Sequence, residues 1–338
     1  MKRLLIAFCL IISFPLHARK FTRVLIPGAT CGDGTTYSVF VNSTGKDARK
    51  LAVEFMGGGV CWDSSSCFGP NLRTWIHPLP KLIGQMNVMV SETEKKSPLH
   101  NHMVLYFPYC AGDVFAGSHT IKYEWGPKVH HTGHSNIEES LVHLQNSGYI
   151  NLDSVQDLVL YGSSAGGIAS LLHSATFDKY ISRKTKRTIL ADAPGLHFGK
   201  TFWNKFTRQQ LRDFNTAFSK VGLNSVMDDG MVANRAPDFC RALRKWEIGI
   251  LQGSQDLIMS SVFGNITPEE HRQLVYSDSG IFELTKSIKN CSAWTPDTLM
   301  HTFLLTTFSA AIQTSDEVSA REFARRIYER RNAGRSYR

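Results

Sequence analysis

The chain has 338 residues, of which 42% are hydrophobic and 20% are charged, and its formal net charge is +9. A chain of this length and hydrophobicity is able to bury a large core, so the composition argues against a disordered protein and fits a single α/β domain. The positive charge comes without a zinc-finger, basic-zipper or RNA-binding signature, and we expect no nucleic-acid partner.

The first 18 residues have the pattern of a signal peptide. Lys2 and Arg3 precede the apolar run Leu4–Phe14, and a small-residue cleavage signal ends at Ala18. The run is shorter than the roughly 20 apolar residues that span a bilayer, and no later segment is long enough, so we expect no transmembrane segment. We predict a secreted or periplasmic protein whose mature chain is 19–338; an uncleaved N-terminal anchor is the alternative.

Six cysteines remain after this cleavage. An even number of cysteines in an exported chain predicts disulfides, with scattered buried thiols as the alternative. Cys61 and Cys67 are close enough in sequence to close a small loop, whereas the spacing leaves the pairing of the others open. The six residues are Cys31, Cys61, Cys67, Cys110, Cys240 and Cys291.

The N-terminal strands differ in pattern from those that follow. Arg23–Ile26 and Tyr37–Asn42 flank a Gly-rich turn, which predicts a β-hairpin. The later apolar runs are continuous, as is typical of strands that are buried on both faces of a parallel sheet. These runs are Lys50–Met56, His102–Phe107, Asp157–Tyr161, Arg187–Ala191 and Ile248–Leu251.

Helical patterns lie between the strands. A capping-box pattern at Ser135 predicts a helix to about Asn146, and Thr207 is expected to cap another. Alternation of strands and helices predicts a mostly parallel central sheet with helices on both faces, and residues 197–245 suggest a helical cap insertion in the single domain 19–338. The remaining predicted helices are Gly166–Phe177, Thr302–Gln313 and Asp316–Arg331.

Gly162-Ser163-Ser164-Ala165-Gly166 matches the pattern Gly-x-Ser-x-Gly. It lies between a buried strand and a helix, which is the context of the nucleophile elbow in the α/β-hydrolase fold. Ser164 occupies the central position, and Ser163 lies one residue out of register. We therefore predict that Ser164 is a catalytic nucleophile; a Gly-rich turn that only packs a helix on a sheet is the alternative.

A serine nucleophile needs backbone N–H groups that stabilise the oxyanion. Ala165, directly after the nucleophile, would supply one of them. Gly57-Gly58-Gly59 follows an earlier buried strand, and we favour Gly58 and Gly59 as the other donors. A phosphate-binding loop is disfavoured because no Gly-Lys-Ser/Thr follows.

The acid and the base of a serine triad follow the nucleophile in this fold. Asp256 comes after the strand Ile248–Leu251, whereas its rival Asp192 lies one strand earlier. Of the later histidines, His301 lies in a loop-like stretch, and His271 lies in a polar helix start that we expect to face solvent. We predict Asp256 as the acid that orients His301, and His301 as the base.

His130, His131 and His134 form a separate cluster. Three imidazoles at close spacing could bind zinc. The glutamate that usually lies between two histidines at helical spacing is absent, so we favour a His-rich surface loop and expect neither a metal nor another cofactor.

With these residues assembled, the chain resembles the pectin acetylesterase / Notum family. Five stretches carry the resemblance, and the second is the most family-specific because the chemistry of an α/β-hydrolase does not require it. They are Gly57–Trp62 with Cys67, Pro108–Gly117, Gly162–Gly167, Ser254–Asp256 and Met300–Thr302.

The resemblance implies a carboxylesterase that removes acyl groups from glycans or from lipidated proteins and that needs no metal. It supports Ser164, Asp256 and His301 as the triad, with Gly58, Gly59 and Ala165 around the oxyanion. It also implies the disulfides Cys61–Cys67 and Cys31–Cys110, which leaves Cys240–Cys291 as the third pair. The chain departs from the family at Ser163, where cysteine is frequent, and at Gly59-Val60, where tryptophan is frequent.

The leading hypothesis is therefore a secreted serine carboxylesterase that hydrolyses O-acyl esters, with O-acetyl esters of a polysaccharide such as pectin as the expected substrates. An esterase for longer acyl chains or lipids is the alternative within this class. A non-catalytic glycan-binding protein and a metal-dependent hydrolase that uses the histidine cluster are the alternatives outside it.

Overall fold

The computed structural model describes residues 21–43, 45–78, 88–91, 97–224, 229–332 and 334–338. The expected signal peptide lies outside these residues. Within them, no helix has both the length and the apolar character needed to cross a membrane.

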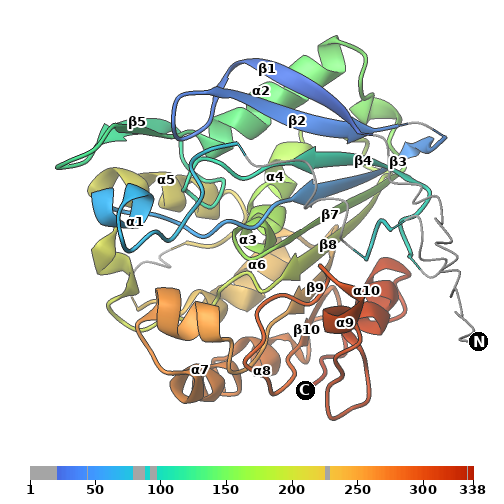
Figure 1. The fold of residues 1–338 in the computed structure, drawn as a ribbon. Helices are drawn as coiled ribbons and strands as arrows, with labels where there is room; N and C mark the ends of the chain where they lie inside the picture. Colours follow the sequence, from blue (N-terminus) through green and yellow to red (C-terminus); the bar gives the residue numbers. More distant parts are fainter. Residues whose placement is uncertain (1–20, 44, 79–87, 92–96, 225–228, 333) are drawn as a thin grey trace, which may run out of the picture.

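An eight-stranded sheet runs through the molecule in the order β1-β2-β4-β3-β7-β8-β9-β10 (Figure 1). The first two strands form the expected antiparallel hairpin, β2 runs antiparallel to β4, and all further neighbours are parallel. The prediction of a mostly parallel α/β fold is confirmed. The strands are β1 Thr22–Thr30, β2 Thr36–Asn42, β3 Asp47–Phe55, β4 His102–Phe107, β7 Asp157–Ser163, β8 Lys186–Asp192, β9 Glu247–Leu251 and β10 Cys291–Trp294.

Three strands do not appear in the sequence prediction. β10 has only four residues and pairs with β9 at the edge of the sheet. β5 (His119–Lys122) and β6 (Lys128–His131) form a separate two-stranded hairpin. Each of these strands is too short, or too polar on one face, to give a clear hydrophobic pattern.

Helices alternate with the strands as expected, but several differ from the predicted bounds. The predicted helix Gly166–Phe177 is divided into two helices at His173, Asp316–Arg331 is helical only over Ala320–Tyr328, and two further exceptions have an identifiable cause. Their bounds are α1 Ser64–Phe68, α2 Gly133–Asn146, α3 Ala165–Leu172, α4 Ser174–Phe177, α5 Arg208–Ser219, α6 Ala236–Ala242, α7 Pro268–Val275, α8 Ile281–Thr285, α9 Thr307–Ala310 and α10 Ala320–Tyr328. Thr207 caps α5 with the reciprocal hydrogen bonds of a capping box, as predicted.

The first exception is the start of α2. The helix begins at Gly133, two residues before the predicted cap Ser135, because the buried carboxylate of Asp113 accepts the N–H of Gly133 at 2.6 Å. A side chain distant in sequence thus replaces the local cap.

The second exception is the predicted helix Thr302–Gln313, which is wrong over most of its length. Only Thr307–Ala310 is helical. The N–H groups of Phe303 and Leu304 donate instead to the carboxylate of Asp192 at 2.8–2.9 Å, which holds this part of the chain in a loop.

The central helices cover both faces of the sheet. The ring of Phe55 on β3 stacks at 5.5 Å on His173, which directly follows α3. On the opposite face, Gly249 of β9 lies against Phe323 and Ile327 of α10. Helices α5 and α6 belong to the predicted insertion between β8 and β9, and α5 lies beyond the strand ends, at the side away from α10 (Figure 1).

The turn between β7 and α3 packs tightly on β3. A Cβ added at Gly166 would lie 2.0 Å from the carbonyl oxygen of Phe55, and one added at Gly162 would lie 2.5 Å from the same atom. Only glycine permits this backbone approach, which aligns the end of β7 with the end of β3.

Three disulfides cross-link segments of the fold. They join Cys31 to Cys110, Cys61 to Cys67 and Cys240 to Cys291, the pairs that the resemblance implied. The first ties the β1–β2 turn to the segment after β4. The third ties α6 to the start of β10, across 51 residues of sequence.

The chain-entropy account of disulfides ranks these bridges by the loop that each one closes. Cys31–Cys110 spans 79 residues and Cys61–Cys67 spans 6. Replacing the first pair by alanine should lower the free energy of unfolding by about 4 kcal/mol, and replacing the second by about 2 kcal/mol. Denaturant unfolding of the two double variants measures both; equal losses would contradict the ranking.

Candidate active site

Ser164 lies at the turn between β7 and α3 with φ 58° and ψ −124°. A non-glycine residue with positive φ is uncommon, and the conformation projects the side chain away from both the strand and the helix. The neighbouring N–H of Ala165 is the first of α3 and therefore has no acceptor within the helix. The geometry is that of the elbow predicted from Gly162–Gly166.

Asp256 and His301, which are 45 residues apart in sequence, are hydrogen bonded. Nδ1 of His301 lies 2.8 Å from Oδ2 of Asp256, whose side chain is fully buried. The carboxylate also accepts the N–H groups of Ile258 and Met259 at 3.0 Å and the side-chain amide of Gln252 at 3.0 Å. These donors stabilise negative charge on Asp256 and hold it in one orientation.

The prediction that His271 faces solvent is wrong. His271 is fully buried on the inner side of α7, and its Nδ1 lies 2.6 Å from the carbonyl oxygen of Ser254. Burial lowers its pKa, which favours the neutral ring. His271 thus braces the loop that carries Asp256 and is not itself brought to Ser164.

Asp192, the rival carboxylate, supports the other side of the same region. It accepts the hydroxyl of Ser163 at 3.0 Å and the N–H groups of Phe303 and Leu304, which follow His301 after Thr302. Burial raises the pKa of Asp192 to about 6, although these donors act in the opposite direction. These contacts hold the loop that follows His301 in place.

The glycine loop after β3 lies beside the elbow. A Cβ added at Gly57 would lie 2.6 Å from the carbonyl oxygen of Ser163 and 3.2 Å from Cβ of Ser164. The carbonyl oxygen of Gly58 accepts hydrogen bonds from the hydroxyl of Thr74 and the N–H of Trp75. Because C=O and N–H point to opposite sides of a trans peptide, these bonds also orient the N–H of Gly59.

Tyr109 connects this loop to the most family-specific stretch of the sequence. Its hydroxyl donates to the carbonyl oxygen of Gly59 at 2.7 Å and accepts the N–H of Val114 at 2.8 Å. Its ring also fills the space where a side chain at Gly58 would lie. The sequence offers one signal for Tyr109, its place inside the stretch Pro108–Gly117, and this signal does not indicate a role for the residue.

Two hollows meet at Ser164. The first, here called the apolar pocket, has a cavity volume of about 60 Å³. Six aromatic residues of the segment 197–245 line it. Its side-chain lining is almost entirely apolar apart from Ser164: Val60, Val114, Ile168, Phe198, Phe202, Trp203, Phe206, Phe214, Phe218, Val232, Met259 and Phe263.

The second hollow, here called the open groove, lies on the other side of Ser164. It shares Ser164, Gly59 and Phe263 with the apolar pocket, and it alone contains His301. Its remaining lining is mixed: Glu54, Phe55, Met56, Gly57, Gly58, Leu72, Arg73, Thr74, Trp75, Tyr106, Ser163, Ile258, Val262, Thr302 and Leu305.

The prediction of a surface loop for the histidine cluster is wrong for two of its members. His131 lies on β6 and His134 on α2, and both are buried. His130, also on β6, is partly exposed and bonds to Thr120. The three imidazoles therefore serve different contacts and do not converge on one point.

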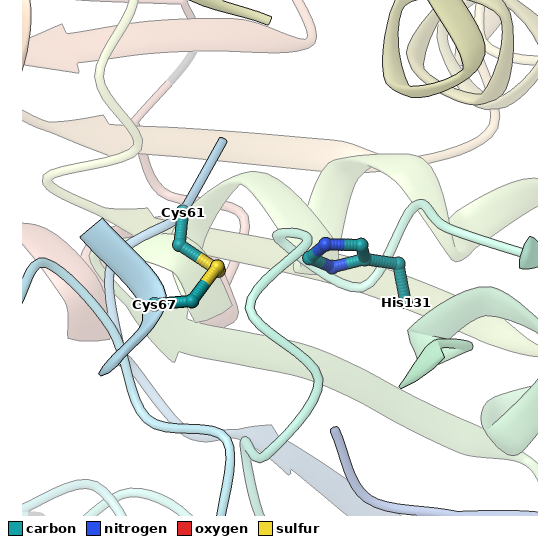
Figure 2. A group of neighbouring side chains, drawn as sticks. All are labelled: Cys61, Cys67 and His131. Carbon is teal, nitrogen blue, oxygen red and sulfur yellow. A yellow bond between two sulfur atoms is a disulfide. The ribbon is translucent and has the colours of Figure 1, made fainter. Parts of the chain in front are cut away.

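Among the described residues, one group has the spacing of a metal site: Cys61, Cys67 and His131 (Figure 2). Both sulfur atoms are joined in a disulfide. The ring nitrogens of His131 lie 2.8 Å from the carbonyl oxygen of Ala111 and 2.9 Å from the hydroxyl of Tyr123, and burial lowers its pKa to about 4. With both cysteines oxidised to a disulfide, the three side chains form a buried structural cluster.

Comparison with known proteins agrees with this architecture. Residues 20–241 match the family described as Pectinacetylesterase. The chain is 23% identical over 217 residues to pectin acetylesterase 5 of Arabidopsis thaliana, which covers 63% of this chain and 49% of that protein. It is 25% identical over 190 residues to the palmitoleoyl-protein carboxylesterase NOTUM of Schmidtea mediterranea, covering 52% of this chain and 34% of that protein.

The human palmitoleoyl-protein carboxylesterase NOTUM is 26% identical over 160 residues, which is 44% of this chain and 30% of that protein. The chain therefore spans between about a third and a half of the length of these relatives. The family match includes Ser164 and the glycine loop and ends before Asp256. Because this match covers well over half of the sequence, the chain belongs to the pectinacetylesterase family.

Proposed function

We propose that the protein is a serine carboxylesterase in which Ser164 attacks the ester and His301 and Asp256 complete the triad. One observation carries the proposal: His301, bonded to the buried carboxylate of Asp256, opens into the same groove as the elbow serine. Family membership supports the same reaction class.

The proton path follows from the hydrogen bond of His301. Nδ1 of His301 is hydrogen bonded to Asp256. Nε2 of the same ring would therefore accept the proton of Ser164 and later donate one to the departing alcohol. Among the described residues, no hydrogen bond joins Ser164 to His301. Such bonds are frequently formed only when the substrate is bound, so we expect this one to form in the complex.

The oxyanion of the tetrahedral intermediate would be held by backbone N–H groups of Gly58, Gly59 and Ala165. The first two belong to the loop whose carbonyl groups are held by Thr74 and Tyr109. Preorganised donors of this kind stabilise developing charge without having to reorient during the reaction.

The position of His301 indicates which hollow would bind the acyl group and which would bind the alcohol. The imidazole must face the leaving oxygen, so the open groove that contains His301 would take the alcohol and the apolar pocket would take the acyl group. An acetyl group would contact only a few of the phenylalanine, Trp203 and aliphatic side chains that line this pocket. We therefore favour an aliphatic acyl chain longer than acetyl.

O-acetyl esters of a polysaccharide such as pectin remain the second candidate. The similarity to pectin acetylesterase 5 favours them. The open groove also presents the half-exposed side chains of Leu72 and Trp75, and an aromatic face of this kind suits a sugar ring.

An exported location is part of the proposal, because three disulfides persist only in an oxidising compartment.

Replacing the nucleophile gives the direct test of the triad. Ser164→Ala should lower kcat for p-nitrophenyl esters by on the order of 10⁴-fold or more with the thermal unfolding temperature unchanged. Ser163→Ala serves as the matched control and should still be labelled at Ser164 by a fluorophosphonate probe. Unchanged turnover in Ser164→Ala would refute the proposal. A folded protein that takes no label would favour the non-catalytic glycan-binding alternative.

An acyl-chain series tests the assignment of the apolar pocket. We expect kcat/KM for p-nitrophenyl esters to rise from acetyl to a medium-length chain. Val232 lines this pocket and not the open groove, so Val232→Trp should reduce the rate on long chains while the acetyl ester is still hydrolysed. An acetyl optimum in the wild type would support the polysaccharide candidate instead.

Tyr109 is expected to act through Gly59. Tyr109→Phe removes the hydroxyl that holds the glycine loop, so kcat should fall about tenfold or more with KM little changed. The matched control is Tyr37→Phe, which removes a buried hydroxyl bonded to Pro108 without touching the glycine loop. Equal effects of the two variants on kcat would show that only stability was changed.

A further inference from the structure

Val114 has a backbone conformation that a β-branched residue rarely adopts. Its φ is 50°, and the φ of the next residue, Phe115, is 59°. A branched side chain crowds the backbone in this left-handed region, so the conformation costs free energy and persists only where its surroundings impose it. Strained residues cluster at functional sites, and the proposed nucleophile Ser164 is another of them in this protein. The conformation of Val114 therefore points to a function.

Hydrogen bonds hold the strained turn on both sides of Val114. The fully buried carboxylate of Asp113 accepts the N–H of Phe115 at 3.0 Å. Nε2 of the buried His173 donates to the carbonyl oxygen of Phe115 at 2.9 Å. The N–H of Val114 itself donates to the hydroxyl of Tyr109 at 2.8 Å. Because the peptide groups before and after Val114 are both held, the direction of its side chain is fixed as well.

The side chain of Val114 faces the apolar pocket. Val114 lines this pocket together with Ser164 and Ala165, and it does not line the open groove. Within residues 110–117 every other residue is buried, whereas Val114 is partly exposed. Its accessible surface therefore borders the space that the acyl group would occupy.

Val114 lies at the end of the pocket where the ester carbonyl would bind. The hydroxyl of Tyr109 connects the N–H of Val114 to the carbonyl oxygen of Gly59, which is one of the proposed oxyanion donors. The carbonyl group of a bound ester must lie between Ser164 and these donors. The side chain of Val114 would therefore contact the first carbons of the acyl chain.

We propose that Val114 is a specificity-determining residue, whose branched side chain narrows the apolar pocket next to the ester carbonyl and rejects acyl chains with a methyl branch on the carbon beside that carbonyl. The hydrogen bonds around the turn keep its backbone from moving aside, and a close-packed wall accommodates an added methyl group only at a cost. The inference rests on the proposed esterase function and on the binding of the acyl group in the apolar pocket.

The test compares two isomeric p-nitrophenyl esters, the pentanoate and the 2-methylbutanoate, which share the leaving group and the number of carbons. The wild type should hydrolyse the pentanoate with the higher kcat/KM. Val114→Gly removes the branched side chain and also relieves the strain, because glycine adopts a positive φ freely. The ratio of kcat/KM for the branched ester to that for the linear ester should rise about tenfold or more, the effect of one carbon in an apolar pocket. If this variant does not fold, Val114→Ala gives a second reading of the same ratio.

Val114→Thr and Glu317→Gly are the matched controls. Threonine keeps the branched shape, so the ratio should stay near its wild-type value. Glu317 also has a positive φ, at 57°, but it lines neither hollow, so its replacement relieves strain without widening the pocket.

Three outcomes would overturn the role of Val114: a wild type that hydrolyses both esters equally well, an unchanged ratio in Val114→Gly, or an equal rise of the ratio in Glu317→Gly. A wild type that hydrolyses neither ester would refute the proposed function and this inference with it.

Discussion

The close contact between β3 and the turn after β7 determines the layout of the site. The carbonyl oxygen of Phe55 occupies the space where side chains at Gly162 and Gly166 would lie, so the two backbones meet without intervening atoms. The contact places the glycine loop that follows Phe55 next to Ser164. It also orients α3 so that its first N–H groups face the elbow. The nucleophile and the proposed oxyanion donors therefore depend on a single packing constraint.

Buried carboxylates hold the loops that surround this contact. Asp113, Asp192 and Asp256 are all fully buried, and each accepts backbone N–H groups from a segment at the edge of the site. Burial raises the pKa of both Asp113 and Asp192 to about 6. Asp113 and Asp192 fix stretches without regular secondary structure, which lets loops carry functional side chains at defined positions. Asp256 instead fixes the start of the π-helix Ile258–Gly264. Of the three, only Asp256 bonds to a histidine that opens into a hollow.

The two hollows on either side of Ser164 differ in the chemistry of the side chains that line them. The apolar pocket is built largely from the segment 197–245, whereas the open groove is built from the strand ends and the loops around Trp75 and Leu305. Under the proposed assignment of the two hollows, the acyl and alcohol preferences would reside in different parts of the chain. A relative could change one preference by altering its insertion while keeping the groove, which is consistent with a family that contains both a pectin acetylesterase and palmitoleoyl-protein carboxylesterases.

The sequence by itself determined the parallel α/β sheet, the elbow around Ser164 and the pairing of Thr207 with its helix, because each depends on a local pattern of apolar, glycine or capping residues. Contacts between distant segments decided the rest. His271 is buried although its neighbours are polar, α2 begins early because of Asp113, and Phe303 lies in a loop because Asp192 binds its N–H. Periodicity does not encode such contacts, since each depends on which strand ends meet in space. For the same reason, only the tertiary structure revealed the apolar pocket and the link from Tyr109 to Gly59.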